Sequence, residues 1–318
     1  MADGSAAAPA RPAPGSMREG RPMTVVVIPA YNEERFIGST VILARQYADR
    51  VIVVDDGSVD ATAAIARAAG AVVVRHRQNR GKGAALNTGL QKACELDPDV
   101  VIAVDADGQH VVAEVTRVAA PVLDGKADIV VGSRYLQGKS RVPAYRSVGH
   151  RMFNFMTNRA SGIAVTDSQS GFRAFSARAL HLITFQSNGF SVESEMQFIA
   201  RQHGLRVVEA PITVHYYDAP KRSVFAHGFM VLNGLLRLMG QYRPLLFLGV
   251  PAVFTLLLAS AWGLWAVYIY RVTQKAAVGY ALISVTLFIV GQAILTTAFI
   301  LHSIRALLLP IIKQGRRR

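Results

Sequence analysis

Two carboxylates, Asp105 and Asp107, stand two residues apart directly after the apolar run 100–104. That run has the character of a buried strand, so both side chains are expected at one end of a sheet. Oxygen ligands suit hard divalent cations such as Mg²⁺ and Mn²⁺, which readily share them with substrate phosphates. Gln109 follows and adds a neutral oxygen. The pattern predicts a metal–diphosphate site, although an Asp-x-Asp taken alone is equally compatible with a solvated turn.

Other polar clusters also follow short apolar runs. Runs 25–28, 51–54 and 129–131 have the continuous Val/Ile character of buried parallel strands. A further strand is expected at 71–74, with helices at 60–69 and 83–95 between the strands. This alternation predicts a doubly wound α/β domain whose ligand site lies outside the carboxyl ends of the strands. The clusters at those ends are Tyr31-Asn32-Glu33-Glu34, Asp55-Asp56-Gly57-Ser58, Asp105-Ala106-Asp107 and Gly132-Ser133-Arg134.

The C-terminal part of the chain carries an excess of apolar residues. Of 318 residues, 51% are hydrophobic, and the mean hydropathy of +0.28 is high for a soluble protein. Two stretches, about 245–270 and 278–303, contain no Asp, Glu, Lys or Arg. Each exceeds the roughly 20 apolar residues that a helix needs to cross a bilayer. We predict a hairpin of two transmembrane helices; a pair of very apolar core helices in a soluble protein is the alternative.

Basic residues flank this predicted hairpin on both sides. The connection between the two stretches contains only two basic residues, Arg271 and Lys275, whereas the C-terminal tail is strongly basic. The positive-inside rule therefore predicts a two-span protein of the cell membrane with its α/β domain and C-terminus in the cytoplasm. The net charge of +14 favours an anionic membrane surface and phosphorylated substrates. Nucleic acid would also suit that charge, but the sequence contains no nucleic-acid-binding motif, so we expect no nucleic-acid partner.

These patterns divide the chain into four segments. Residues 1–22, rich in Ala, Pro and Gly, are expected to form a disordered leader, and residues 23–224 a cytoplasmic α/β domain. Residues 225–243 are expected to form an amphipathic helix at the membrane surface, with an ordinary packed helix as the alternative. Residues 244–318 complete the chain as two transmembrane helices and a basic tail. The sequence is compatible with a monomer or with a homo-oligomer.

Five motifs occur in order along the α/β region. They are Pro29-Ala30-Tyr31-Asn32-Glu33-Glu34, Val53-Val54-Asp55-Asp56-Gly57-Ser58, Asn79-Arg80-Gly81-Lys82-Gly83, Asp105-Ala106-Asp107-Gly108-Gln109-His110 and Gly132-Ser133-Arg134-Tyr135. With these motifs, residues 24–215 resemble an inverting family 2 glycosyltransferase of the GT-A fold, which has a doubly wound, Rossmann-like mixed sheet. The resemblance is strongest to the dolichyl-phosphate mannose synthases and their polyprenyl-phosphate glycosyltransferase relatives.

The resemblance implies a nucleotide-sugar site and a metal site. Glu33 is expected at the ribose hydroxyls, and Asp56 with the Val54 backbone at the edge of the base. Lys82 is expected at the diphosphate, with a solvated loop as the competing interpretation. A Mg²⁺ or Mn²⁺ ion would stabilise the departing nucleotide. The implied metal ligands are Asp105, Asp107 and Gln109, and the implied nucleotide-sugar-binding residues are Pro29, Tyr31, Glu33, Val54, Asp56, Lys82, Asp105, Ala106 and Asp107.

The implied acceptor is a phosphate monoester at the end of a polyprenyl (dolichyl) chain. Its second pKa lies near 6, so the acceptor is already an anionic nucleophile at neutral pH and needs no strong base. The protein must instead hold two anions close together, which requires cations. Arg134, Arg146 and Arg222 are the expected acceptor-phosphate ligands, because the guanidinium fork suits phosphate oxygens. For Arg222, attraction to lipid headgroups is the alternative, and residues 221–223 depart from the family pattern.

Three further acidic positions and four histidines complete the analysis. Asp167 is expected to orient the acceptor, with a structural turn as the alternative, so the expected catalytic residues are Asp107, Arg134 and Asp167. Glu193 and Glu195 resemble family residues on a helix, but a salt-bridged helix face is the favoured interpretation. No metal-ligand spacing is found among four histidines, which receive no role: His110, His150, His203 and His215.

The expected reaction moves a hexose from a nucleotide sugar to a polyprenyl phosphate, giving a lipid-linked sugar donor for glycan assembly. GDP-mannose is the favoured donor because the Asp-Ala-Asp-x-Gln-His motif most resembles that of the mannose synthases. The alternative is a UDP-glucose or UDP-GlcNAc transferase acting on polyprenyl phosphate or on another lipid or glycan. A sugar-nucleotide pyrophosphorylase would show a Gly-rich N-terminal loop, and a processive synthase a Gln-x-x-Arg-Trp motif; neither pattern occurs. A non-catalytic scaffold would tolerate loss of the metal ligands, yet Asp105 and Asp107 are intact.

Overall fold

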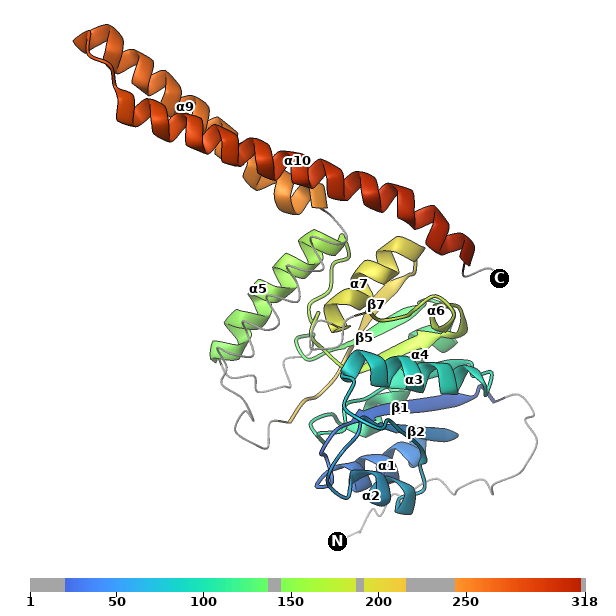
Figure 1. Ribbon diagram of the computed structural model, residues 1–318. Helices are drawn as coiled ribbons and strands as arrows, with labels where there is room; N and C mark the ends of the chain where they lie inside the picture. The colour runs from blue at the N-terminus through green and yellow to red at the C-terminus, as the bar shows by residue number, and fades with distance from the viewer. Residues whose placement is uncertain (1–20, 137–143, 187–191, 216–243, 316–318) are drawn as a thin grey trace. The chain divides into compact units, whose positions relative to one another are not determined.

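The computed structural model describes residues 21–136, 144–186, 192–215 and 244–315 (Figure 1). The chain divides into two compact units, residues 1–231 and 232–318, which we describe separately. Most of the predicted leader, the predicted interfacial helix at 225–243 and Arg222 lie outside the described residues.

The described residues of the first unit form a mixed sheet of seven strands, in the order β3-β2-β1-β4-β6-β5-β7. Strands β1 to β4 are mutually parallel, β6 is antiparallel to both of its neighbours, and β5 and β7 are parallel to each other. The predicted mixed α/β sheet is confirmed, and the structure adds two strands, β6 and β7. The strands are β1 (Thr24–Ala30), β2 (Arg50–Asp55), β3 (Val72–Arg75), β4 (Val100–Ala103), β5 (Ile129–Ser133), β6 (Arg173–Ser176) and β7 (Val207–Pro211).

Helices cover both faces of this sheet because alternate residues of its strands point to opposite faces. Val26 and Ile28 of β1 pack with α1, α2 and α4, whereas Val25 and Val27 pack with α3, α6 and α7. Both faces are therefore buried, which explains the continuous apolar runs in the sequence. The helices are α1 (Ile37–Tyr47), α2 (Thr62–Ala68), α3 (Lys82–Cys94), the 3₁₀ turn η1 (Val112–Glu114), α4 (Val115–Leu123), α5 (Ala144–Ser161), α6 (Ala177–Leu180) and α7 (Val192–His203).

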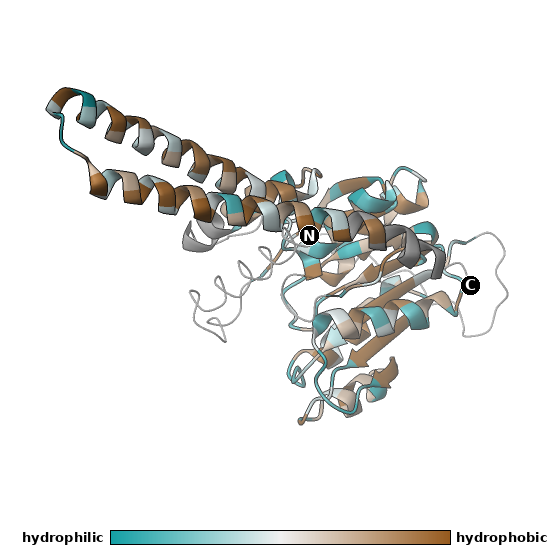
Figure 2. Cartoon of the chain, turned by 45° about the horizontal axis from the view of Figure 1, so that its top comes forward, coloured by the Kyte–Doolittle hydropathy of each residue, from teal (hydrophilic) through white to brown (hydrophobic). Residues whose placement is uncertain are grey.

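The second unit contains a hairpin of two long helices, α9 (Val250–Thr273) and α10 (Val278–Gly315), preceded by a π-helical turn, η2 (Leu245–Gly249). Residues 245–273 and 278–304 are long and apolar enough to cross a membrane. Only 11% and 6% of the residues in their most apolar windows are buried. Figure 2 shows hydrophobic colour along most of both helices. Helices this apolar and this exposed differ from the core helices of a soluble protein.

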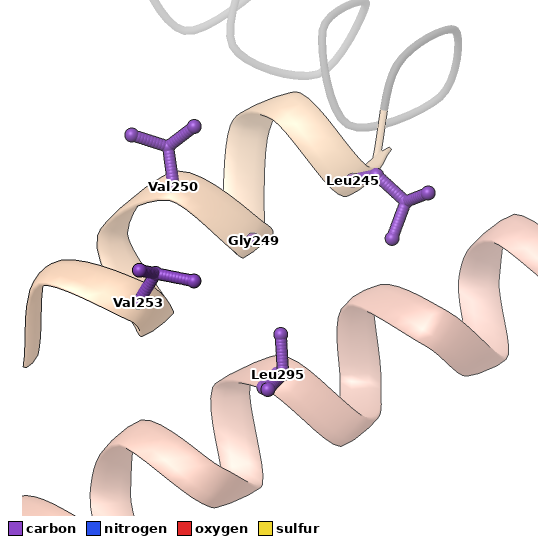
Figure 3. Close-up of a pocket in the computed structure, with 5 residues that line it drawn as sticks. All are labelled: Leu245, Gly249, Val250, Val253 and Leu295. Atoms are coloured by element: carbon purple, nitrogen blue, oxygen red, sulfur yellow. The ribbon is translucent and has the colours of Figure 1, made fainter. Parts of the chain in front are cut away.

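Small residues line the contact between α9 and α10. Ala252, Ala259 and Ala266 recur every seven residues and are buried. The Ser284 hydroxyl of α10 donates a 2.8 Å hydrogen bond to the Ala259 carbonyl. Small residues with one interhelical hydrogen bond are typical of helix pairs that associate within lipid. At the open end of the hairpin, a shallow apolar groove of about 370 Å³ is lined by Leu245, Gly249, Val250, Val253 and Leu295 (Figure 3).

Candidate active site

The topology of the sheet gathers the polar motifs at one edge. The loops after β1, β2 and β4 leave the carboxyl ends of parallel strands, as predicted. Strand β6 runs the other way, with Arg173 opposite Ala103 at the end of β4. The segment that leads into β6, from Asp167 to Gly171, therefore reaches the same edge as Asp105. Sequence periodicity does not place this segment there, because β6 has only four residues and lacks a continuous apolar run.

Lys82 joins two carboxylates at this edge. Its Nζ lies 2.6 Å from Oδ1 of Asp105 and 2.7 Å from Oε1 of Glu193. Lys82 begins α3 and Glu193 lies in the first turn of α7, so the three groups come from different elements. The Lys82 side chain is 23% exposed and ion-paired, which does not fit the alternative of a solvated loop. Glu193 is buried in the site rather than on a solvent-facing helix surface.

Burial and charge shift the pKa values of these groups in opposite directions. Burial disfavours the charge on Lys82, but Asp105 and Glu193 outweigh it and raise the lysine pKa. Burial likewise opposes ionisation of Asp105, yet Lys82 and His110 hold its pKa well below the usual range. Burial and the nearby Asp105 charge raise the pKa of Asp107. The two carboxylates therefore repel one another, and Lys82 balances only part of their charge.

Asp105 is also packed closely from behind. Its Oδ2 lies 3.8 Å from Nε2 of His110, a buried ring that contacts Phe172 edge-on. Gly171 lies so near that a Cβ atom there would stand 2.6 Å from Cγ of Asp105. Asp105 is thus held by Lys82 on one side, His110 on another and the Gly171 backbone on a third. His110 had no predicted role, since its spacing in the sequence carries no signal for this contact.

Asp107 and Gln109 lie in the same loop as Asp105. The backbone N–H of Gln109 donates to Oδ1 of Asp107 over 3.1 Å. The backbone carbonyl of Gln109 accepts a hydrogen bond from the backbone N–H of His215 over 2.8 Å. This second bond ties the loop to the segment that follows β7. Among the described residues, no cluster of three or more His, Cys, Asp or Glu side chains has the arrangement of a metal site. The loop therefore offers two carboxylates and the side-chain amide oxygen of Gln109. These oxygen ligands suit a hard cation whose remaining ligands are phosphate oxygens and water.

Asp56 is buried at the end of β2, where it organises the loop before α3. Its Oδ1 lies 2.6 Å from Nδ1 of His76 and accepts the Arg80 amide at 2.9 Å. Its Oδ2 accepts the Gly81 amide at 2.7 Å. Nε2 of His76 lies 2.9 Å from the Thr88 hydroxyl. Asp55, for which the resemblance implied no binding role, pairs with Arg75 at 2.9 Å and accepts the Ser58 amide.

The loop after β1 is tied to the loop after β2. Asn32 adopts a left-handed backbone with φ of 54°, and its amide donates to the Ser58 hydroxyl. The Glu33 amide donates to the Thr62 hydroxyl at the start of α2. These contacts hold Tyr31, which is 45% exposed, and Glu33 at the same edge as Asp56. Of the remaining predicted nucleotide-site residues, Pro29 lies in β1, Val54 is buried in β2, and Ala106 is buried in the loop after β4.

A second charged cluster contains Arg134 and Asp167. Nε of Arg134 lies 2.6 Å from Oδ2 of Asp167, and both side chains are largely buried. Oδ1 of Asp167 is buried and has no hydrogen-bond partner among the described residues. Glu209 of β7 holds this loop in place by accepting the Thr166 and Asp167 amides. Arg146 lies in the first turn of α5, with its side chain outside the described residues.

Buried Arg173 lies between the two clusters. Its guanidinium donates to the backbone carbonyls of Ser168 and Ser170, each over 2.8 Å. Burial lowers its pKa, while Glu193, Asp167 and Asp105 act against that shift. One buried guanidinium therefore interacts with carboxylates of both clusters. The structure brings Asp105 and Arg134 to one edge, as predicted, and places Lys82 and Asp167 in contact with them. It adds His76, His110, Arg173, Glu193 and Glu209 to the site.

A mixed sheet with acidic and basic groups gathered at this edge defines a domain of the GT-A fold. Residues 25–183 match the glycosyl transferase family 2, and the chain belongs to this family.

Similar proteins agree with that assignment. A UDP-N-acetylglucosamine–dolichyl-phosphate N-acetylglucosaminyltransferase of Methanococcus voltae is 35% identical over 67% of this chain and 94% of its own. A polyprenol monophosphomannose synthase of Mycolicibacterium smegmatis is 32% identical over 60% of this chain and 76% of its own. A glucosyl-3-phosphoglycerate synthase of Mycobacterium tuberculosis, solved with Mn²⁺, UDP and glucosyl-3-phosphoglycerate, has a TM-score of 0.56. It is 25% identical over 69% of this chain and 80% of its own.

Proposed function

We propose that this family 2 glycosyltransferase is a membrane-bound, inverting enzyme that moves a hexose from a nucleotide sugar to a polyprenyl (dolichyl) phosphate. The observation that carries the proposal is the pair of charged clusters at one sheet edge, Lys82–Asp105–Glu193 and Arg134–Asp167. A reaction between two anionic substrates needs two sites with cations, one for each phosphate group. Relatives named for dolichyl-phosphate and polyprenol-phosphate transfer support the same acceptor class.

The donor cluster fits a divalent metal. Asp105 and Asp107 offer carboxylate oxygens in one loop, and burial together with the Asp105 charge raises the pKa of Asp107. We propose that Asp105, Asp107 and Gln109 hold Mg²⁺ or Mn²⁺, as the Mn²⁺ and UDP in the solved relative also suggest. When bound, the ion would supply positive charge to the leaving diphosphate.

The protein side chains then have distinct tasks in the proposed site. Lys82, released from Asp105 but still paired with Glu193, contributes a cation to the donor diphosphate. Glu33 accepts hydrogen bonds from the ribose hydroxyls, and Asp56 meets the base. Arg134 binds the acceptor phosphate, and Asp167 fixes the direction of the Arg134 side chain through their 2.6 Å contact. Arg146 and Arg222 are proposed to add positive charge around the acceptor.

Two donor classes remain as proposals. The Asp-Ala-Asp-x-Gln-His motif, residues 105–110, favours GDP-mannose through its resemblance to the mannose synthases. The 35% identical relative named for a UDP sugar, and the UDP in the solved relative, favour a uridine donor. The charged clusters suit either class, because both donors carry the same diphosphate.

We further propose that α9 and α10 cross the cell membrane. The helices expose apolar surface along their length, and a polyprenyl chain would bring the acceptor phosphate to the surface of that membrane. We propose the cytoplasmic surface for the reaction, because the basic residues that flank the hairpin favour that orientation.

The test of this function is metal-dependent transfer by the purified full-length protein in detergent. Wild-type protein with Mn²⁺, a panel of nucleotide sugars and a polyprenyl phosphate should give a lipid-soluble sugar. Asp107→Ala and EDTA should each abolish the product while leaving the far-UV circular dichroism unchanged, because Asp107 lies on a loop. Transfer that survives both the substitution and the chelator would refute the metal assignment.

A further inference from the structure

The carboxylate of Asp56 already accepts three hydrogen bonds from its own protein. The His76 ring and the Arg80 amide both meet Oδ1, at 2.6 and 2.9 Å, and the Gly81 amide meets Oδ2 at 2.7 Å. An ionised carboxylate only accepts, so Nδ1 of His76 carries the proton in this contact. In the neutral ring Nε2 is then an acceptor, and the Thr88 hydroxyl at 2.9 Å is placed to donate to it.

These bonds use most of the accepting capacity of Asp56. A carboxylate has about four lone-pair positions, two on each oxygen. Both positions on Oδ1 are filled, and one of the two on Oδ2 is filled. The side chain is also only 4% exposed, which leaves little room for a second contact. Asp56 can therefore accept one further hydrogen bond, through Oδ2.

Nucleobases differ in how many donors they present to such a group. The edge of guanine carries two adjacent donors, the ring N1–H and the exocyclic amino group, and a carboxylate meets both only by offering one oxygen to each. Uracil presents a single ring N–H between two carbonyl oxygens. One available position on Oδ2 matches uracil and leaves one guanine donor without an acceptor. A buried donor without a partner is costly, so the mismatch would weaken binding.

We infer that the donor of this enzyme is a uridine diphosphate sugar. His76 holds Asp56 so that the Asp56 carboxylate accepts a single hydrogen bond, from the ring N–H of uracil. The inference rests on the proposed function, since it names the nucleotide class for that site. His76 is a positioning residue here, because it acts on the base only through Asp56.

The test compares UDP with GDP on full-length protein in detergent, by titration calorimetry in the presence of Mn²⁺. The two ligands share the same diphosphate and ribose, so their difference reports the base. One unmatched donor should make GDP bind roughly 10- to 100-fold more weakly than UDP. Equal affinity, or tighter binding of GDP, would overturn the inference and leave the proposed function standing. Absence of binding by either nucleotide would overturn both.

Two variants test whether His76 sets this preference. His76→Phe keeps a ring of similar size but removes the donor to Oδ1, so a lone-pair position becomes available on each oxygen. The ratio of UDP to GDP affinity should then fall severalfold, whereas general damage to the site would weaken both nucleotides alike. Thr88→Val is the matched control, because it removes the other partner of His76 and keeps the contact with Asp56. An unchanged ratio in His76→Phe would show that His76 does not set the base preference.

Discussion

The backbone of Gly171 lies directly against the carboxylate of Asp105: a Cβ atom on Gly171 would stand 2.6 Å from both Cγ and Oδ1 of Asp105. The two residues are 66 positions apart, and the antiparallel pairing of β6 with β4 brings them together. The Gly171 backbone thus forms one wall around a carboxylate that we propose as a metal ligand.

Gly171→Ala should therefore disable the metal site without removing any ligand. The added methyl group would stand 2.6 Å from Cγ of Asp105, so the Asp105 carboxylate must move away from its position. We expect affinity for Mn²⁺, measured by electron paramagnetic resonance of the free ion, to fall about tenfold or more. Gly279→Ala, at a position with no heavy atom within 4 Å, is the control and should bind Mn²⁺ normally. Normal Mn²⁺ binding by Gly171→Ala would contradict the proposed position of the ion.

Arg134→Ala should impair use of the acceptor far more than binding of the donor. Loss of a charge-assisted contact to phosphate costs about 2–3 kcal/mol, or roughly 30- to 150-fold in turnover or in the acceptor requirement. Arg134→Lys should restore only part, since lysine supplies charge without the fork. Calorimetry with nucleotide sugar alone, and rates at varied acceptor concentration, separate the two effects.

The ion pair with Asp167 complicates the alanine variant. Asp167 is fully buried, so removal of Arg134 leaves an uncompensated charge that destabilises the fold. The double variant Arg134→Ala/Asp167→Asn removes that charge and should recover stability but not acceptor use. If Arg134→Ala weakened donor binding and left acceptor dependence unchanged, Arg134 would belong to the donor site.

The two-helix hairpin predicts which parts of the chain lie on each side of the membrane. A reporter fused after Arg318 should lie in the cytoplasm, and one inserted near Gln274 should lie outside. Gln274 ends α9 in a left-handed conformation, with φ of 52°, so an insertion there extends a turn rather than a helix. The asymmetry of basic residues sets the expected direction. Two reporters in the same compartment would rule out a two-span hairpin.

Asp128 should couple the stability of the first unit to pH. It is buried directly before β5, where it accepts the amide of Arg206, the residue before β7, at 2.8 Å and contacts the Arg206 guanidinium. Burial opposes its charge, but the bonds from Arg206 outweigh burial and lower its pKa. A lowered carboxyl pKa adds stability above the unfolded value of about 3.9, and that stability is lost as pH falls through the folded value.

Asp128→Asn should therefore lower the opening free energy of β5 and β7 by about 1.5–3 kcal/mol at pH 7. Hydrogen exchange resolved to these strands measures the effect, and thermal melts below pH 4 should show a smaller difference from wild type. Tryptophan fluorescence is unsuitable, because both tryptophans, Trp262 and Trp265, lie in α9. Asp124→Asn, at a half-exposed pair with Lys126, is the control. Equal exchange protection in Asp128→Asn and wild type would contradict the assigned role.

Strands with a continuous apolar run were predictable from the sequence. β1, β2 and β4 are buried on both faces, so they contain only Val, Ile, Ala and Pro between their ends. β6 has four residues that include Arg173 and Ser176, and β7 contains Glu209 and ends at Pro211. Their place in the sheet comes from pairing with distant strands, and residue type alone carries little of that information.

The candidate site shows the same division. The loops after β1, β2 and β4 could be placed because each motif follows a recognisable strand. The contact between Lys82 and Glu193 spans 111 residues, and that between Asp56 and His76 joins loops after two different strands. Such contacts depend on the packing of α3 against the sheet and on the position of α7. The sequence therefore predicts which charged residues follow the strands at this edge. The contacts that these residues make are seen only in the folded structure.

The most direct test of the account is product analysis with two acceptors that differ only in a phosphate. Full-length protein in detergent, with Mn²⁺ and the preferred nucleotide sugar, is offered polyprenyl phosphate or the matching unphosphorylated polyprenol. We predict a sugar linked through phosphate to the lipid in the first reaction, with inverted configuration at the anomeric carbon, and no transfer in the second. Transfer to polyprenol, to a soluble glycan or only to water would contradict the proposal that the two charged clusters join a nucleotide sugar to a lipid phosphate.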